Sequence, residues 1–161
     1  MARKKTRTSN NPHFELLSIA QFAKLAMTFW VGGTLTIGFI VVPLLFKSID
    51  EISAATIAGQ LFNINAYIGI ISLLLALVNE GIAHRLTLFT LRKFWYIIAM
   101  MAILVINYFA IFPIIVRLRT KLLDLANHVI IHSSSFNFWH SLSAILFIII
   151  CVLGVLYILE K

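Results

Sequence analysis

Four long runs of apolar residues dominate the pattern along this chain. They cover about residues 22–46, 61–78, 94–116 and 138–159. A transmembrane helix needs roughly 20 predominantly apolar residues, and a backbone in lipid must satisfy its own hydrogen bonds, so each run is predicted to be helical. The pattern therefore predicts an all-α membrane protein, a bundle of four transmembrane helices.

Polar residues mark the ends of these helices. Asn11 and Pro12 are typical of a helix start, with a side-chain cap followed by proline at the first helical position. The first helix is expected to run from Pro12 through Phe46, and Ser48 and Asp50 to cap a helix that begins before the second run. We expect residues 1–11 to form a basic cytoplasmic tail and residues 12–161 to form a single four-span membrane domain.

A shorter amphipathic pattern lies between the third and fourth runs. Apolar residues recur there at helical spacing, with polar and charged residues on the opposite side. The apolar set is Leu118, Leu122, Leu125 and Val129, together with His132, and the polar set is Arg119, Asp124, Asn127 and His128. This pattern predicts a short interfacial helix on the outer surface.

Composition and charge agree with a membrane protein that has little outside the bilayer. Apolar residues make up 61% of the chain and charged residues 12%, about half the charged fraction of a soluble domain. The net charge of +7 comes from an N-terminal cluster and from residues that flank the runs. Such a distribution indicates topology signals and lipid contacts, so the expected partner is the bilayer and not nucleic acid. The larger share of Lys and Arg predicts both termini in the cytoplasm, with a bacterial inner membrane as the expected location.

The chain also repeats itself weakly. Pro43 and Pro113 each lie near the outer end of a run and are followed four residues later by a cation, Lys47 or Arg117. A Phe-Asn pair opens the next apolar helix in both halves, at Phe62-Asn63 and at Phe136-Asn137. The alternatives are chance similarity and a parallel repeat of two helical hairpins related by an axis along the membrane normal. A bundle of this kind would use Gly32, Gly33, Gly38, Gly69 and Gly154 for close approach between helices.

Polar residues inside the runs are the candidates for chemistry. His140 lies at the outer end of the fourth run, where an ionisable group indicates either a functional site or a neutral imidazole bonded to a neighbouring helix through Asn63 or Asn65. His128 and His132 are spaced to chelate a metal, with His140 as a further ligand, but the same pair also fits the polar face of an interfacial helix. Asn107 is expected to hydrogen-bond across helices.

The inner end of the second run carries Asn79 and Glu80, close in sequence to Arg85. We expect these three residues to form an interfacial polar cluster. Cys151 is the only cysteine, so no disulfide or thiolate cluster is expected.

Several of these segments resemble one known family. Residues 29–33 (Phe-Trp-Val-Gly-Gly), 42–46 (Val-Pro-Leu-Leu-Phe) and 58–62 (Ala-Gly-Gln-Leu-Phe) are similar to blocks of the domain of unknown function 4149 family, the group of eukaryotic transmembrane protein 205. Residues 107–113 and 136–143 resemble its later blocks. The resemblance implies a four-span membrane protein without an established biochemical activity.

A more distant similarity links the Trp-x-Gly-Gly segment to copper-resistance D-type proteins and to HemJ-type haem-binding oxidases. Those families carry a histidine in the first span, ahead of the tryptophan. This chain has no histidine between Phe14 and Gly81.

Two classes of function follow. The first is a non-enzymatic membrane protein without a cofactor, acting as an interaction subunit, a stress component or a permeation element, in a homo-oligomer or with another membrane protein. The alternative is a haem- or copper-binding protein that uses His140 with His128 and His132. No catalytic triad, phosphate loop or dinucleotide fingerprint is present in the sequence.

Overall fold

The fold was analysed in a computed structural model, which describes residues 12–84, 87–126 and 134–160. Every long element in this part of the chain is a helix. The helices are α1 (Pro12–Thr36), α2 (Val42–Ser48), α3 (Glu51–Ala83), α4 (Arg92–Val105), α5 (Phe112–Ala126) and α6 (Ser134–Leu159), with a short 3₁₀ turn at Leu88–Thr90. Two π-helical turns, Ile37–Val41 and Ile106–Ile111, join α1 to α2 and α4 to α5.

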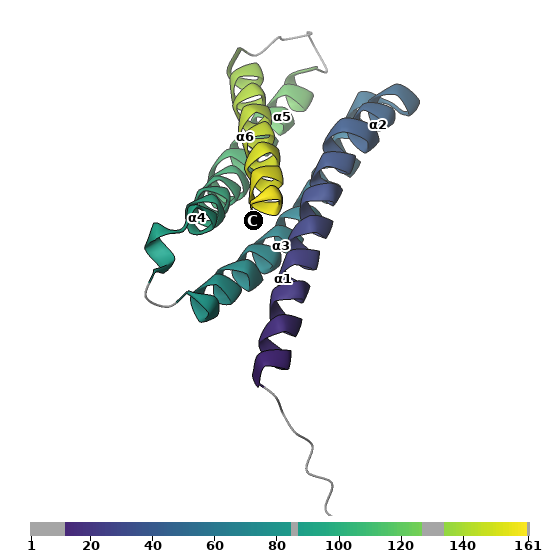
Figure 1. Cartoon of the computed structure of the whole chain (residues 1–161). Coiled ribbons are helices and arrows are strands. Elements are labelled where there is room, and N and C mark those ends of the chain that lie inside the picture. The colour runs from purple at the N-terminus through teal and green to yellow at the C-terminus, as the bar shows by residue number, and fades with distance from the viewer. Residues whose placement is uncertain (1–11, 85–86, 127–133, 161) are drawn as a thin grey trace, which may run out of the picture.

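These elements form a bundle of four membrane-length helices. Helix α1 packs against α3, α3 against α4, α4 against α6, and α6 against α1, so the helices close into a ring (Figure 1). The chain reverses direction between α2 and α3 and again between α3 and α4 (Figure 1). As a result, the start of α1, the end of α3, the start of α4 and the end of α6 share one side of the bundle.

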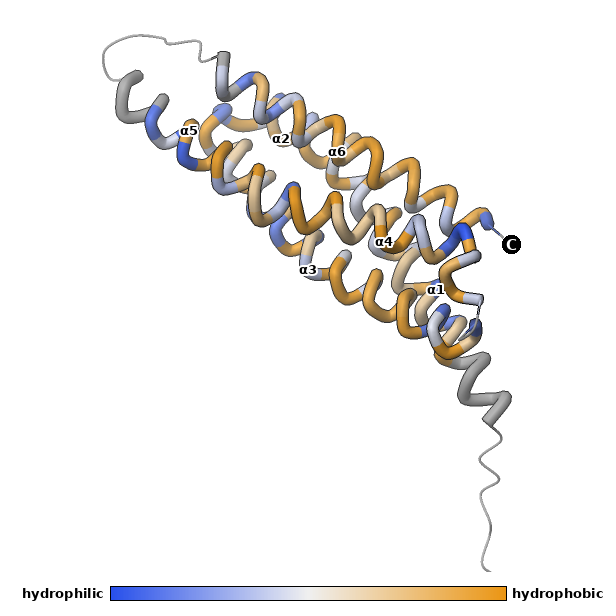
Figure 2. The backbone as a smooth tube through the Cα atoms, turned by 90° about the vertical axis from the view of Figure 1, so that its left-hand side faces the viewer, coloured by the Kyte–Doolittle hydropathy of each residue, from blue (hydrophilic) through white to orange (hydrophobic). Residues whose placement is uncertain are grey.

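Four helical segments are long and apolar enough to cross a membrane. They are Ile19–Ser48, Glu51–Ala83, Arg92–Lys121 and Asn137–Leu159, with 30, 33, 30 and 23 residues. Apolar residues dominate along the tube of the helices (Figure 2), and many large apolar side chains face outward, including Phe29, Phe39 and Phe109. An apolar exterior of this kind requires lipid around it. The prediction of an all-α, four-helix membrane protein is confirmed.

The helices extend beyond the predicted apolar runs. Helix α3 begins at Glu51, ten residues before the second run, because the Asp50 side chain accepts a hydrogen bond from the backbone N–H of Ser53 over 2.8 Å. This is an N-terminal cap. Ala54 and Ala58 are buried on this added stretch, so it belongs to the packed bundle. Asp50 therefore acts as the predicted cap, whereas Asn11 lies outside the described residues.

The third span also continues past its predicted end. Helix α5 runs from Phe112 to Ala126 without a break, so residues 118–126 prolong the spanning helix and do not start a separate one. The predicted interfacial helix is thus helical as far as Ala126 but continuous with the span. Its remaining part, including His128 and His132, falls outside the described residues.

Close contacts between helices use small residues at particular points. A Cβ atom on Gly69 would lie 2.4 Å from the Trp30 indole, one on Gly38 would lie 2.2 Å from the Phe147 ring, and one on Gly154 would lie 2.6 Å from Val31. These glycines let large side chains of a neighbouring helix approach the backbone. Gly32 differs, because a Cβ there would meet no described atom within 4 Å.

Both π-helical turns precede a proline at the same place. Pro43 and Pro113 are each the second residue of the helix that follows the turn, and in both turns a backbone N–H bonds a carbonyl five residues earlier, Val42 to Ile37 and Phe112 to Asn107. Proline has no N–H and its ring crowds the carbonyl four residues before it, so a wider turn relieves the conflict. The two hairpins therefore share one irregularity at equivalent positions, which supports the predicted repeat. Superposition of the two hairpins is the direct test of it.

Candidate functional site

A cavity between the four helices is the main candidate site. It has a volume of about 270 Å³ and is partly open. Its walls come from all four spans, in the middle of the bundle and toward the side of Glu51. The lining residues are Trp30, Thr34, Gly38, Val42, Phe62, Asn65, Ala66, Leu104, Asn107, Tyr108, Phe112, His140, Ser143, Ala144, Phe147 and Ile150.

One wall of the cavity is a polar network between α1 and α3. The Trp30 indole Nε1 donates to the backbone carbonyl of Asn65 over 3.1 Å, and Asn65 Nδ2 donates to the Thr34 hydroxyl over 2.9 Å. That hydroxyl donates to the Trp30 carbonyl, one turn earlier, over 2.7 Å. All three residues are buried. The network fixes the position of the Asn65 amide at the cavity wall.

A second polar pair joins the third span to α6. The Ser143 hydroxyl donates to Oδ1 of Asn107 over 2.8 Å. Asn107 lies within the π-helical turn Ile106–Ile111, which rotates residues after it relative to a regular helix. Asn107 therefore makes an interhelical bond, as predicted, and does so at the cavity.

Tyr108 adds a third polar contact at the cavity. Its hydroxyl donates to Oδ1 of Asn63 and hydrogen-bonds the Tyr67 hydroxyl over 3.0 Å. The ring of Tyr108 stacks on Phe112 with an interplanar angle of 7° and meets Tyr67 edge to face. The Tyr108 hydroxyl thus faces α3, while the Tyr108 ring forms part of the aromatic lining of the cavity.

His140 also lines this cavity, and its side chain is exposed. The two asparagines predicted as its partners bond elsewhere, Asn63 to Tyr108 and Asn65 to Thr34. Among the described residues no group of three or more His, Cys, Asp or Glu side chains is placed to hold a metal ion. Since His128 and His132 are outside that set, the predicted histidine metal site stays a prediction.

Two of the predicted glycines and the two predicted prolines lie on α1, α2 and α5. Gly33 lies beside Asn65, whose Oδ1 would be 3.6 Å from an added Cβ. Pro43 and Pro113 follow the π-helical turns and lie at the end of the cavity nearer Glu51, next to the lining residues Val42 and Phe112. Gly32 points away from the bundle interior.

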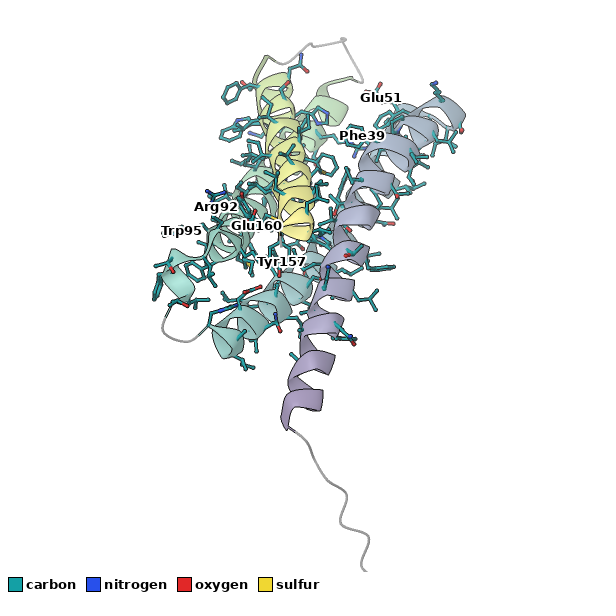
Figure 3. The ribbon with its side chains drawn as sticks, in the orientation of Figure 1. Phe39, Glu51, Arg92, Trp95, Tyr157 and Glu160 are labelled. Atoms are coloured by element: carbon teal, nitrogen blue, oxygen red, sulfur yellow. The ribbon has the colours of Figure 1, made fainter. Side chains whose placement is uncertain are left out.

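A separate polar group occupies the other end of the bundle. Glu80 is buried, and its Oε2 lies 3.9 Å from Nε2 of His84 on the following turn. Tyr157 is buried near the end of α6, and Figure 3 shows it with Glu160 toward the start of α4, away from Glu51. The predicted third member of the cluster, Arg85, lies outside the described residues. Glu80 is not among the residues that line the cavity.

Several residues that line the cavity were not predicted from the sequence as site residues, notably Trp30, Thr34, Tyr108 and Ser143. Trp30 and Thr34 follow one another at a spacing of four and so share a helix face. Ser143 lies three residues after His140, also on one face. These spacings were available in the sequence, but the partners across the bundle were not.

Comparison with known proteins agrees with this architecture. The sequence model described as "Domain of unknown function (DUF4149)" matches residues 25–124. The chain is therefore a four-span membrane protein, and it belongs to the DUF4149 family. No curated protein and no solved structure matches it.

The family match includes three spans and most of the cavity walls. It ends at residue 124, before α6, so His140 and Ser143 lie beyond it. The more distant similarity to copper-resistance D-type and HemJ-type proteins stays an untested prediction.

Proposed function

We propose that this protein is a non-enzymatic membrane protein that binds a small neutral molecule in the cavity between its four spans. The binding would serve permeation, a stress response or a membrane complex. The observation that carries the proposal is the cavity itself, which has walls from every span and fixed polar groups in an otherwise apolar lining. Ligand sites of proteins have this character.

The chemistry of the walls supports a neutral ligand. No Lys, Arg, Asp or Glu is among the lining residues. Apart from the His140 imidazole, no lining side chain is of a kind that carries a positive charge, and none is a carboxylate, so a charged molecule at membrane depth loses its hydration with at most one opposite charge to replace it. This loss costs several kcal/mol or more. The amides and hydroxyls that do line the site suit uncharged hydrogen-bonding groups.

The size of the cavity favours a small ligand. At about 270 Å³ it lies just below the range of roughly 300–1,000 Å³ that is typical of pockets for drug-sized molecules. A haem macrocycle would require the helices to move apart. Haem or copper binding through His140, with His128 and His132, is the alternative, and a visible spectrum with metal analysis of the purified protein tests it.

Location and partners belong to the same proposal. We propose that the protein resides in the inner membrane of a bacterium with both termini in the cytoplasm, as the distribution of Lys and Arg favours. We propose a further partner within the bilayer, either a second copy or another membrane protein.

Trp30 provides a direct test of ligand binding because it lines the cavity. The double variant W95F/W139F retains Trp30 as its only tryptophan. In lipid nanodiscs, small neutral aromatic molecules such as toluene, phenol and benzoquinone should change its fluorescence saturably. Saturation separates a site from simple partition into lipid.

A matched pair of variants locates the effect. Ala144 lines the cavity, so A144F fills it and should abolish saturation. Ala102 is exposed on α4 and lies outside the cavity walls, so A102F should leave the response intact. If no probe gives a saturable change, or if A144F leaves it unaltered, the proposed function is wrong.

A further inference from the structure

The amide of Asn107 has hydrogen-bonding capacity that its neighbours leave unused. Its Oδ1 accepts from Ser143, whereas its Nδ2 group carries two further hydrogens. Among the hydrogen bonds of the described residues, none has Asn107 Nδ2 as donor. In that same part of the chain, no fully buried side-chain nitrogen or oxygen lacks a partner. Nδ2 of Asn107 is therefore not fully enclosed by protein atoms, and Asn107 is one of the residues that line the cavity.

Asn65 contributes a second amide to the same cavity. One hydrogen of its Nδ2 group goes to Thr34, which leaves the other hydrogen for a ligand. The hydroxyl protons of Thr34 and Ser143 are already donated to Trp30 and Asn107. The cavity thus offers N–H donors from two fixed amides, which suit an acceptor on the ligand, and Oδ1 of Asn65, which accepts no hydrogen bond from the described residues, is open to a donor as well.

Aromatic rings form much of the remaining wall. Trp30, Phe62, Tyr108, Phe112 and Phe147 all line the cavity. Flat faces and edges of this kind pack well against another flat ring. Together with a volume of about 270 Å³, this lining suits one ring of moderate size.

We propose that the cavity binds the ring of a membrane-dissolved quinone, with a carbonyl oxygen accepting a hydrogen bond from Nδ2 of Asn107. The inference rests on the proposed function and names the ligand class for that site. A quinone ring is neutral and flat, and its carbonyl groups accept hydrogen bonds but donate none. Any isoprenoid tail would leave through the open side of the cavity into the surrounding lipid.

Two molecules of nearly the same shape test this ligand class. Duroquinone carries two carbonyl oxygens at the positions where hexamethylbenzene carries two methyl groups, and its flat ring is a cyclohexadienedione in place of an aromatic ring. Duroquinone should quench Trp30 saturably in the W95F/W139F protein in nanodiscs. Hexamethylbenzene, added as a competitor, should bind about two- to tenfold more weakly, which is the loss expected for one hydrogen bond.

Substitution of Asn107 identifies the donor. N107L should weaken duroquinone binding about two- to tenfold and leave hexamethylbenzene binding unchanged or slightly tighter. N79L is the matched control, because Asn79 lies outside the cavity walls, and it should bind duroquinone as the parent does. S143A removes the hydrogen bond that holds the Asn107 amide in place and should weaken duroquinone binding less than N107L does. It provides the test if N107L does not fold.

The outcomes separate the two proposals. If duroquinone and hexamethylbenzene compete equally, or if N107L and S143A both retain full duroquinone affinity, the quinone assignment is overturned while the cavity remains a ligand site. If neither molecule binds saturably, both the ligand class and the proposed function fail.

Discussion

The Trp30 indole lies directly against Gly69, across the contact between α1 and α3. A Cβ atom on Gly69 would come within 2.4 Å of both Cε2 and Nε1 of the indole. Trp30 has no room to retreat, because it is 1% exposed and its Nε1 is bonded to the Asn65 carbonyl. One glycine thus allows the indole to reach the cavity wall.

Replacement of this glycine should destabilise the bundle. G69A forces the indole or α3 to move, and overpacking of this kind costs about 1–3 kcal/mol. Unfolding in mixed micelles, followed by circular dichroism, measures the loss. G32A is the control, because its Cβ has open space and alanine favours a helix by up to about 1 kcal/mol over glycine. Equal effects of the two substitutions would contradict the packing described for Gly69.

The bond between Thr34 and Asn65 should contribute measurably to stability. T34V removes the acceptor of Asn65 Nδ2 while keeping the shape of the side chain, and a loss of about 1 kcal/mol is expected for an interhelical bond in a membrane. In a double-mutant cycle, T34V should lower the free energy of unfolding clearly less in the N65L background than in the parent protein.

Thr36 provides the control for that cycle. It is exposed, and its hydroxyl bonds only the Gly32 carbonyl of its own helix, so T36V should change stability little. If the stability losses of T34V and N65L simply add in the double variant, the hydrogen bond between Thr34 and Asn65 does not couple the helices.

Arg119, on α5, hydrogen-bonds the start of α3. Its Nη2 donates to the Ile52 carbonyl over 2.6 Å and to the Thr56 hydroxyl over 3.2 Å. We expect R119A to increase hydrogen exchange over residues 51–56 several-fold, because those backbone groups lose an ordered partner. R117A, which changes an exposed arginine on the same helix, should leave this exchange unaltered. Exchange that rises only elsewhere would refute the role of Arg119.

The Asp50 cap predicts a pH dependence at the same end of α3. The backbone hydrogen bond from Ser53 holds the pKa of the Asp50 carboxyl below its ordinary value of 3.8. A carboxyl with a lowered pKa stabilises the folded state above its unfolded pKa and loses this contribution as the pH falls through its folded pKa. The first turn of α3 should therefore loosen only in strong acid.

Two variants test this pH dependence by NMR of the α3 amides. D50N keeps an acceptor for the Ser53 N–H and should remove the acid transition, whereas D50A should loosen the turn at every pH. An Asp50 carboxyl that titrates above pH 4 in the parent protein would contradict the assignment of this cap.

The sequence was informative about the spans and much less so about the cavity. Length and apolarity alone predict the four helices, and the local chemistry of Asp50 predicts the start of α3. The apolar run alone left out the first ten residues of α3, because small residues such as Ala54 and Ala58 look neutral until a neighbouring helix buries them. The pattern of residues along one helix does not show which of them a neighbouring helix will bury.

The site depends on relations between distant residues. Asn65 and Asn107 were recognised as polar residues at membrane depth, but their partners Thr34 and Ser143 are ordinary in sequence. The π-helical turn that positions Asn107 is explained by Pro113, which follows it in the sequence. Pro43 follows the other π-helical turn in the same way. Only the packing of helices shows which polar groups share one cavity.

The four crossings can be tested with single cysteines in a C151A background. S48C and S135C should lie on one face of the membrane, and T87C and E160C on the other. In intact vesicles, a membrane-impermeant maleimide should therefore label one pair and spare the other, with both pairs labelled after permeabilisation. Labelling of S48C and T87C from the same face would contradict the four-span account.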